Sequence, residues 1–205
     1  MTQEKPAIGV LALQGNVIEH VRALEEAGAR AIAVKTAEQL ASVDGLIVPG
    51  GESTTVMKLL ERFALAEPVR ERVRSGMPLW GTCMGLIVAA RDVAGMPDQP
   101  TLDLIDVTVR RNAFGRQAAS AEMLLEIPEL GPQPFPAVFI RAPWIERTGP
   151  AVRTLATVDG HGVLVRQGHV LGSSFHPELS ADRRLHAYFV AMVAQAAIGK
   201  RPTAA

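Results

Sequence analysis

The stretch that decides the fold is MPLWGTCMGLIVAARD, residues 77–92. It joins PLWGT, a short apolar run typical of a buried strand, to MGLIVAARD, which we predict to be a helix. Cys83 lies at the junction, with a glycine two positions before it and another two positions after it. This pattern is typical of a nucleophile elbow, a sharp strand-to-helix turn that leaves no room for larger flanking side chains. We therefore expect an open α/β sheet that exposes the Cys83 thiol at the carboxyl end of its strand.

The role of this cysteine has two interpretations. It is the single cysteine in 205 residues, so it cannot form a disulfide within the chain. A free cysteine is most often one more buried apolar side chain, and that interpretation stays open. The alternative is a nucleophile, since a helix N-terminus favours the thiolate form of a cysteine. The two flanking glycines favour the nucleophile.

Outward from the elbow, the first half of the chain alternates apolar runs with amphipathic segments. Because the apolar runs are continuous, they predict strands that are buried on both faces. The segments between them have helical periodicity, and the second one opens with Ser or Thr as a helix cap. This alternation predicts a parallel sheet with helices on both faces. The expected strands are 7–13, 30–35 and 44–51, and the expected helices are 16–29 and 53–65.

After about residue 100 the pattern changes to short strands separated by Gly and Pro turns. Few helical patterns intervene, so we expect antiparallel pairing there. The expected strands are 102–111, 120–127, 137–142, 162–168 and 169–175, followed by a helix over 181–199. The fold class is therefore α/β, with a three-layer, open, mostly parallel sheet flanked by helices and antiparallel strands in its second half. We expect one domain over residues 1–198 and a flexible tail at 199–205.

Composition limits the classes of partner and location. Lys plus Arg and Asp plus Glu number 21 each, so the formal charge is zero. That balance argues against nucleic acid, which demands a basic surplus. No segment reaches the roughly 18 apolar residues that a membrane helix needs. The N-terminal apolar run is too short for a signal peptide, and a lone cysteine fits a reducing compartment, so we expect a cytoplasmic protein.

A thiol nucleophile needs a base, and the base needs an orienting group. His176 closes an apolar strand and begins HPELS, where Pro177 stiffens the chain and Glu178 follows two residues on. This corner can aim the histidine ring at a neighbour while the carboxylate holds the ring from behind. A strand exit that caps the last helix, with Ser180 as its N-cap, is an alternative interpretation, and both can hold. The remaining histidines are expected to be structural; they are His20, His161, His169 and His186.

Acyl transfer also needs an oxyanion hole, a pair of N–H groups that stabilise the negative oxygen of the intermediate. The N–H of Met84, next after the nucleophile, is one expected donor. The other is expected from the loop PGGEST, residues 49–54, where Gly50 and Gly51 allow the backbone to turn its amides inward. A Gly-Gly pair alone usually marks a simple turn, so this assignment depends on the elbow.

Taken together, these motifs carry a resemblance to a known family. PGGES, GTCMG and SSFHPE resemble the class I, triad-type glutamine amidotransferases. GVLALQGNVIEH, VPGGESTT, RRNAFGRQ, VFIRAP and FHPE look more narrowly like the glutaminase subunits of pyridoxal 5′-phosphate synthase. The similarity runs from about residue 7 to residue 193. RRNAFGRQ, FIRAP and the N-terminal LQG point to the narrower group.

The resemblance implies a reaction and residues for it. Cys83 would attack the side-chain amide of L-glutamine to form a glutamyl thioester, and His176 would carry a proton to the leaving ammonia while Glu178 orients it. Gly51 and Met84 would form the oxyanion hole. The residues implied to bind L-glutamine are Gly51, Glu52, Ser53, Arg111, Ile140 and Arg141. For the two arginines a guanidinium grip on the substrate carboxylate is weighed against an ordinary surface ion pair.

The resemblance also implies a partner. Such glutaminases pass ammonia to a barrel-shaped synthase subunit, which joins it to a pentose phosphate and a triose phosphate to make pyridoxal 5′-phosphate. The synthase would form a double-ring core with glutaminase subunits around it, and Gln14 and Gly15 would lie at the partner surface. No cofactor or metal is expected, since the sequence offers no Cys/His cluster. Met84 departs from the pattern, because the resemblance implies a smaller residue after the nucleophile.

Other functions remain as alternatives. A glutaminase that serves another synthase, such as that of histidine biosynthesis, would share the triad but should lack RRNAFGRQ and LQG. A peptidase-like protein of the same architecture would put a cysteine on an elbow without the HPE corner. A catalytically silent binding subunit would have no physical need to keep Cys83, His176 and Glu178 together.

Overall fold

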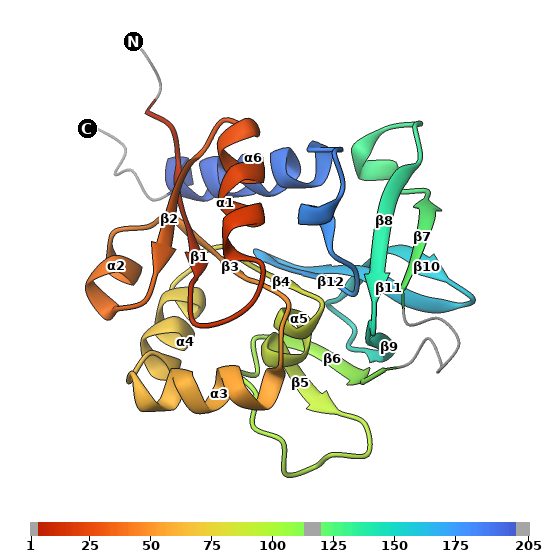
Figure 1. Ribbon diagram of the computed structural model, residues 1–205, viewed down its shortest axis with the longest axis horizontal. Helices are drawn as coiled ribbons and strands as arrows, with labels where there is room; N and C mark the ends of the chain where they lie inside the picture. Colours follow the sequence, from red (N-terminus) through yellow and green to blue (C-terminus); the bar gives the residue numbers. More distant parts are fainter. Residues whose placement is uncertain (1–3, 113–119, 200–205) are drawn as a thin grey trace.

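The computed structural model describes residues 4–112 and 120–199, and its centre is one large mixed sheet (Figure 1). The strand order is β2-β1-β3-β4-β12-β11-β9-β6-β5, and β10 pairs with β11. The strands of this sheet are β1 (Ala7–Leu11), β2 (Arg30–Val34), β3 (Gly45–Val48), β4 (Leu79–Thr82), β5 (Ala90–Val93), β6 (Ile105–Arg110), β9 (Trp144–Thr148), β10 (Arg153–Val158), β11 (His161–Gln167) and β12 (Val170–Ser173). A separate antiparallel pair consists of β7 (Ser120–Leu125) and β8 (Phe135–Ile140).

Helices cover both faces of the sheet, as the alternating pattern predicts (Figure 1). The helices are α1 (Val17–Glu26), α2 (Ala37–Ala41), α3 (Ser53–Arg62), α4 (Ala66–Arg74), α5 (Met84–Ala89) and α6 (Arg184–Gly199), with 3-10 turns η1 (Pro128–Leu130) and η2 (Pro177–Leu179). One apolar core joins the sheet to α2, α3, α4 and α5. A second core joins the opposite face to α1, α6 and the β7–β8 pair. The predicted three-layer α/β architecture is therefore confirmed.

The half of the sheet that holds the elbow is parallel. β1 pairs with β2 and β3, and β4 pairs with β3 and β12, all in parallel register. Every residue of β1, β3, β4 and β12 is buried, which explains the continuous apolar runs in the sequence. Because β4 and β12 are parallel neighbours, the segments that follow them leave the sheet at the same edge.

The other half is antiparallel, as expected from its short strands. β11 pairs antiparallel with β12, β10 and β9, and β9 pairs antiparallel with β6. Only β5 and β6 are parallel in this half. The polar-apolar alternation of β6 matches its burial, since alternate residues face the core.

The predicted helix over residues 84–92 is wrong at its end. The helix α5 stops at Ala89, and the chain continues directly as strand β5. The carbonyl oxygens of Val88 and Ala89 accept hydrogen bonds from the N–H groups of Leu102 and Leu104. These partners lie beyond an intervening turn, so the local apolar pattern could not reveal them.

Other elements differ from the sequence prediction in smaller ways. The helices α2 and α4 and the strands β9 and β10 were not predicted, since each is short or mostly polar in pattern. The last helix begins at Arg184 rather than at residue 181. The Asp182 carboxylate accepts from the Arg184 N–H, while the Ser180 hydroxyl accepts from the Asp182 N–H two residues earlier, so Ser180 is not the N-cap.

Two predicted features lie outside the described residues. Residues 113–117 of the RRNAFGRQ motif are not described, and neither are residues 200–205 of the expected tail. No helix within 4–112 and 120–199 has the length and apolar character needed to cross a membrane.

Candidate active site

The turn after β4 has the geometry that its glycines predict. Cys83 adopts φ +50° and ψ −107°, a backbone conformation that side chains other than hydrogen rarely permit. A Cβ atom at Gly81 would lie 2.4 Å from the carbonyl oxygen of Gly85. A Cβ atom at Gly85 would lie 1.9 Å from the carbonyl oxygen of Val48. Only glycine fits at either flank, and the turn raises the Cys83 side chain above the sheet edge.

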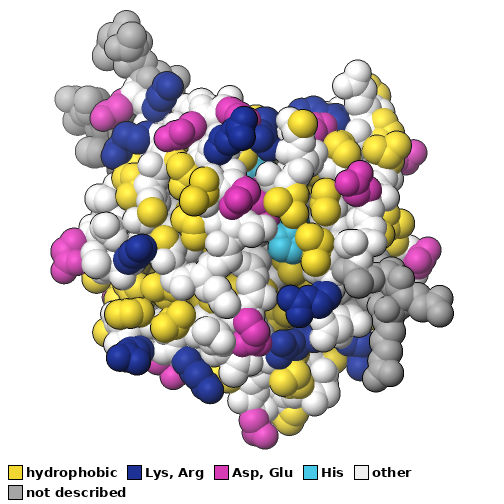
Figure 2. Space-filling model, viewed as in Figure 1, with side chains coloured by type: hydrophobic (Ala, Val, Ile, Leu, Met, Phe, Trp, Pro, Cys, Tyr) yellow, Lys and Arg dark blue, Asp and Glu magenta, His cyan; other side chains and the backbone are white. Residues whose placement is uncertain are grey.

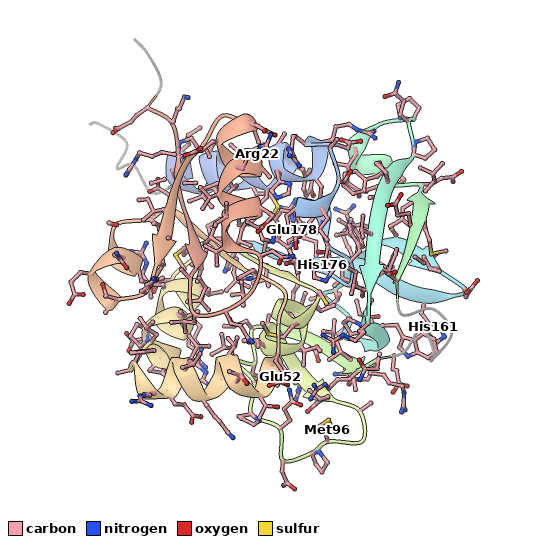
Figure 3. The ribbon with its side chains drawn as sticks, in the orientation of Figure 1. Arg22, Glu52, Met96, His161, His176 and Glu178 are labelled. Carbon is pink, nitrogen blue, oxygen red and sulfur yellow. The ribbon has the colours of Figure 1, made fainter. Side chains whose placement is uncertain are left out.

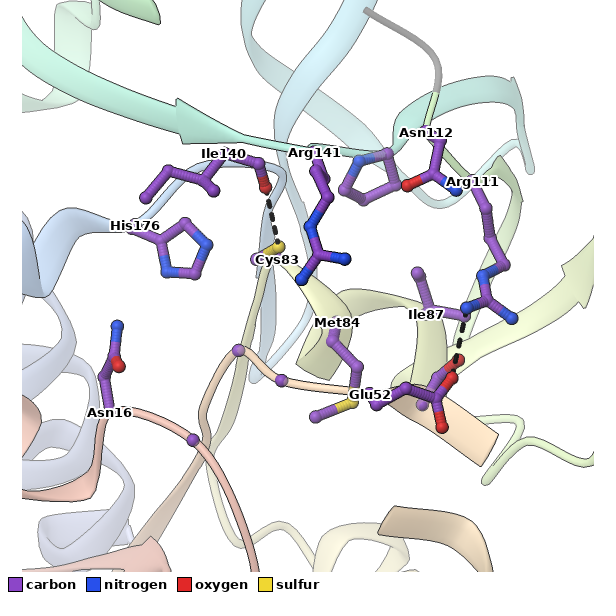
Figure 4. A pocket seen from close by; sticks show the side chains of 15 residues that line it. Asn16, Glu52, Cys83, Met84, Ile87, Arg111, Asn112, Ile140, Arg141 and His176 are labelled. Atoms are coloured by element: carbon purple, nitrogen blue, oxygen red, sulfur yellow. Dashed lines mark hydrogen bonds and ion pairs between the residues drawn. The ribbon is translucent and has the colours of Figure 1, made fainter. Parts of the chain in front are cut away.

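The Cys83 side chain lines a pocket of about 310 Å³ at this edge (Figure 4). The cysteine itself is 7% exposed, so it is largely buried, as the apolar interpretation requires, yet its sulfur has access to the pocket. The Sγ atom lies 3.8 Å from the carbonyl oxygen of Ile140. Figure 2 shows histidine near the centre of one face, beside apolar and basic side chains.

Most residues that the sequence singled out meet in this pocket. Gly15, Gly51, Glu52, Ser53, Cys83, Met84, Arg111, Ile140, Arg141 and His176 line it. Glu178 lies behind His176, and Gln14 reaches the loop of residues 49–54 from outside the pocket, where its side-chain oxygen accepts from the Glu52 N–H at 3.1 Å. Gly50, expected in the 49–54 loop, also lines the pocket, and sequence reasoning missed four further lining residues: Asn16, Ile87, Asn112 and Pro143.

His176 follows β12, the strand next to β4. His176 Nδ1 lies 2.8 Å from Glu178 Oε1. The ring also lies close to the elbow: a Cβ atom on Gly50 would be 2.5 Å from His176 Cε1 and 3.4 Å from Cys83 Cβ. Figure 4 shows the His176 ring beside the Cys83 side chain. Cysteine, histidine and carboxylate therefore stand in the order that nucleophilic catalysis needs.

The electrostatics of this trio favour a charged histidine. Burial alone would lower the pKa of His176, but hydrogen bonds with Cys83 and Glu178 outweigh it and raise that pKa to about 10. Burial would raise the pKa of Glu178, but its hydrogen bond to His176 and the nearby histidines bring that pKa down to about 2. An imidazolium between a carboxylate and a thiol is placed to pair with a thiolate, the nucleophilic form of cysteine.

Two residues behind the trio were not identified from the sequence as functional. The Asn16 side-chain amide donates to Glu178 Oε1 at 2.9 Å. His20 Nε2 lies 3.3 Å from Glu178 Oε2, and His20 is fully buried. Both residues come from the start of the chain, more than 150 positions from Glu178, so no local pattern connects them to it.

The pocket wall opposite His176 is formed by an ion pair, which a glutamine side chain holds through hydrogen bonds. Arg111 Nη2 lies 3.1 Å from Glu52 Oε1 (Figure 4). Arg111 Nη1 donates to Gln99 Oε1 at 3.1 Å. Gln99 in turn donates to Ser53 Oγ at 2.8 Å. Arg111 thus forms an ion pair, but the pair lines the pocket instead of the outer surface. Gln99 carries no motif signal in the sequence.

Glu52 has a second structural role at the same wall. Its carboxylate caps α3 by accepting from the N–H groups of Thr54 and Thr55 at 3.3 and 2.8 Å. Burial would raise the pKa of Glu52, but the hydrogen bonds from Thr55 and Thr54 lower it to about 2. A fixed negative charge beside a guanidinium suits a ligand that carries an ammonium and a carboxylate. No group of three or more His, Cys, Asp or Glu side chains within the described ranges could hold a metal ion.

Comparisons with known proteins agree with this geometry. Residues 10–195 match the model of the SNO glutamine amidotransferase family. Pyridoxal 5′-phosphate synthase subunit PdxT of Acidothermus cellulolyticus is 56% identical over 196 residues, which cover 93% of this chain and 95% of that protein. The same subunit of Frankia casuarinae is 54% identical, with 95% and 98% covered.

Solved structures give the same result. A crystal structure titled glutamine amidotransferase superposes with a TM-score of 0.86 at 48% identity, over 91% of this chain and 98% of the other. A putative GMP synthase protein from Thermoplasma acidophilum shares the fold, with a TM-score of 0.70 at 16% identity over 97% of this chain and 100% of the other. From the family match and the close relatives, we conclude that this chain belongs to the SNO glutamine amidotransferase family.

Proposed function

We propose that the protein hydrolyses L-glutamine to L-glutamate and ammonia and supplies the ammonia to a partner synthase that makes pyridoxal 5′-phosphate. The observation that carries the chemistry is the arrangement of Cys83, His176 and Glu178 beside an open pocket. The names of the close relatives supply the pathway, since they are subunits of pyridoxal 5′-phosphate synthase.

The reaction proceeds in two halves. In the first, Cys83 Sγ attacks the side-chain amide carbon of glutamine, and the C–N bond breaks to leave a glutamyl thioester. His176 gives its proton to the leaving nitrogen, which departs as ammonia. In the second half, His176 takes a proton from water, the resulting hydroxide attacks the thioester carbon, and glutamate leaves as the Cys83 thiolate returns. Glu178 holds His176 throughout.

The substrate is bound by the two ends of the pocket. Arg111 and Arg141 take the α-carboxylate of glutamine, while Glu52 faces its ammonium group. Ile140 and Ser53 complete the wall around the substrate. The N–H groups of Met84 and Gly51 stabilise the oxygen of the tetrahedral intermediate. The contact of Arg111 with Glu52 supports this assignment, because the pair already stands at the pocket wall.

The partner is a barrel-shaped synthase subunit in a double-ring core, with glutaminases bound around it. Gln14 and Gly15 lie on the side that meets the partner. The hydrogen bond from the Glu52 N–H to the Gln14 side chain supports this proposal, since a partner that moves Gln14 would also move the loop of residues 49–54, which carries the Gly51 N–H. The glutaminase needs no cofactor or metal of its own.

The test is glutamate release from L-glutamine by the purified chain, with and without a pyridoxal 5′-phosphate synthase subunit. We expect strong stimulation by that subunit. The variant Cys83→Ala should lose about 10⁴-fold or more in kcat, because no other group in the pocket can form the thioester.

The folding of Cys83→Ala should be intact, since the flanking glycines and not the thiol shape the turn. A urea unfolding curve close to that of the wild type would establish this. Glutamate release that persists in the variant would contradict Cys83 as nucleophile. Activity that is indifferent to the synthase would contradict the proposed pathway while leaving the chemistry in place.

A further inference from the structure

Two buried histidines lie directly behind Cys83, His176 and Glu178, and neither has a part in the chemistry described above. His20 on α1 and His186 on α6 are both fully buried, and His20 Nδ1 lies 3.2 Å from His186 Nε2. Figure 3 shows Glu178 between helix α1 and the His176 ring. The other nitrogen of His20 faces Glu178 Oε2 at 3.3 Å and Thr82 Oγ1 at 3.2 Å.

Glu178 Oε2 requires a donor from this pair. The oxygen is buried and makes no well-aligned hydrogen bond to a described residue. Its partner oxygen, Oε1, is engaged by His176 and Asn16. A buried carboxylate oxygen without a donor is costly, so the His20 nitrogen that faces it is expected to carry a hydrogen.

That requirement fixes the hydrogens of both rings. If His20 carries its hydrogen on Nε2 and is neutral, its Nδ1 is an acceptor and must receive the Nε2–H of His186. His186 Nδ1 is then a bare acceptor, and it has no hydrogen-bond partner among the described residues. In the opposite assignment both rings carry their hydrogen on Nδ1. The buried Nδ1–H of His186 would then have no partner among the described residues, and the lone pair of His20 Nε2 would point at the Glu178 carboxylate.

Both rings are neutral at ordinary pH. Burial is the main cause, and it lowers the pKa of His20 to about 4 and that of His186 to about 3. A neutral donor orients the carboxylate without adding a positive charge that would compete with His176. The negative charge of Glu178 is therefore left for the imidazolium of the base.

We propose that His20 is a positioning residue of the reaction: its Nε2–H, shared between Thr82 Oγ1 and Glu178 Oε2, fixes the Glu178 carboxylate that aims His176, and His186 fixes the tautomer of His20. This inference rests on the proposed glutaminase function. Glu178 then has one oxygen for the catalytic base and one for the protein core, so its carboxylate plane cannot rotate during turnover.

Two substitutions at one position separate positioning from packing. In His20→Gln the side-chain amide nitrogen can reach the place of Nε2, whereas in His20→Asn it reaches only the place of Nδ1. We expect His20→Asn to lose about 10- to 100-fold in kcat, since small displacements of a catalytic group have effects of that size. KM for glutamine should stay near the wild-type value, the alkaline limb of the pH–rate profile should move to lower pH, and His20→Gln should recover most of the rate.

His169→Asn is the matched control. His169 makes a comparable hydrogen bond, from Nε2 to the Val73 carbonyl oxygen at 2.7 Å, but it does not line the active-site pocket. Its kcat should be unchanged. The proposal is overturned if His20→Asn turns over at the wild-type rate, or if His20→Gln is as slow as His20→Asn.

Should His20→Asn fail to fold, the wild type still provides the test. Nuclear magnetic resonance of the protein labelled with ¹⁵N-histidine reads the tautomer of each ring. We expect neutral Nε2–H forms for His20 and His186 at pH 7, and an Nδ1–H form of His20 would overturn the proposal. Failure of the proposed function looks different: wild-type protein with its synthase would then release no more glutamate than Cys83→Ala does.

Discussion

At the scale of single residues, the position of the Cys83 thiol is determined by its backbone. A non-glycine residue at φ +50° costs about 1–3 kcal/mol, and the surrounding structure must hold it there. The Cys83 N–H donates to the Ser173 carbonyl at 2.7 Å, and the Cys83 carbonyl accepts from the Leu86 N–H at 3.1 Å. These bonds fix the turn on both sides, so the sulfur is held in place by atoms that do not take part in the reaction.

Arg111 and its neighbour allow a matched test of substrate binding. Arg111 lines the pocket, while Arg110 points elsewhere and pairs with Glu146. We expect Arg111→Ala to raise KM for glutamine about 10- to 100-fold with a small effect on kcat, since a hydrogen bond to a charged group is worth about 1.5–3 kcal/mol. Steady-state glutamate release at varied glutamine concentrations measures this.

Arg110→Ala provides the comparison for that measurement. It removes the same side chain from the adjacent position, so general effects on charge and on β6 are shared. KM for glutamine in Arg110→Ala should match the wild type. Equal values of KM in the two variants would show that Arg111 does not bind the substrate.

The residues that could be predicted from the sequence are those with local signatures. Cys83 has its glycines, and His176 and Glu178 are two positions apart. The roles of His20, Asn16 and Gln99 could not be predicted, because their partners lie far along the chain. His20 and Asn16 stand within GVLALQGNVIEH, but nothing in that motif marks either side chain as a partner of Glu178. The packing of α1 against η2 brings His20 and Asn16 close to Glu178.

At the scale of elements, the elbow depends on the contact between α5 and β3. The close approach of Gly85 to the Val48 carbonyl lets the helix start directly above the neighbouring strand. Such close approaches need glycine, so the glycines that flank Cys83 allowed the strand, the turn and the start of the helix to be predicted from the sequence. The end of α5 could not, because residues 102–104 terminate the helix through backbone bonds that have no side-chain signature.

Two alanine substitutions test this contact. Gly85→Ala should destabilise the protein by about 3 kcal/mol or more, since a methyl group forced against a backbone carbonyl cannot be accommodated by a side-chain shift. Gly162→Ala, in β11, is the control, because its Cβ would meet nothing closer than 3.6 Å. Its effect should stay below about 1 kcal/mol. Urea unfolding of both variants measures the difference, and equal losses would contradict the steric account of the elbow.

At the scale of the whole molecule, the buried histidines make stability depend on pH. The unfolded chain binds protons on His20 and His186 below about pH 6.5, whereas burial lowers their folded pKa values to about 4 and about 3. The unfolded state therefore gains protons that the folded state does not bind, and the free energy of unfolding falls as pH drops from 6.5 towards 4. Below pH 4.5 the lowered pKa of Glu178 adds a further loss, as pH falls towards about 2.

We expect the loss to approach about 1.4 kcal/mol per pH unit for each of the two histidines. Urea unfolding between pH 6.5 and 5 measures it, in a window that lies above the ordinary range of carboxyl groups. The variant His186→Phe should roughly halve the slope, because one of the two groups is gone. A slope that is the same in this variant and in the wild type would contradict the assignment.

The overall architecture could be predicted because the buried strands of its parallel half are continuous apolar runs in the sequence. The sequence could not show that β12, from the end of the chain, lies next to β4, since strand order is a property of the assembled sheet. In register, Gly172 pairs with Gly81 and Ser173 with Thr82. That pairing is what places His176 beside Cys83.

The pairing of β4 with β12 has a consequence for how such a chain tolerates insertions and deletions. One residue added within β12 would advance His176 by about 3.3 Å and turn alternate side chains to the opposite face of the sheet. One residue removed from β4 ahead of Cys83 would draw Cys83 back by the same distance and would likewise turn alternate side chains to the opposite face. Length is thus fixed between Leu79 and Cys83 and between Val170 and His176, while loops at the opposite edge of the sheet are free to grow or shrink.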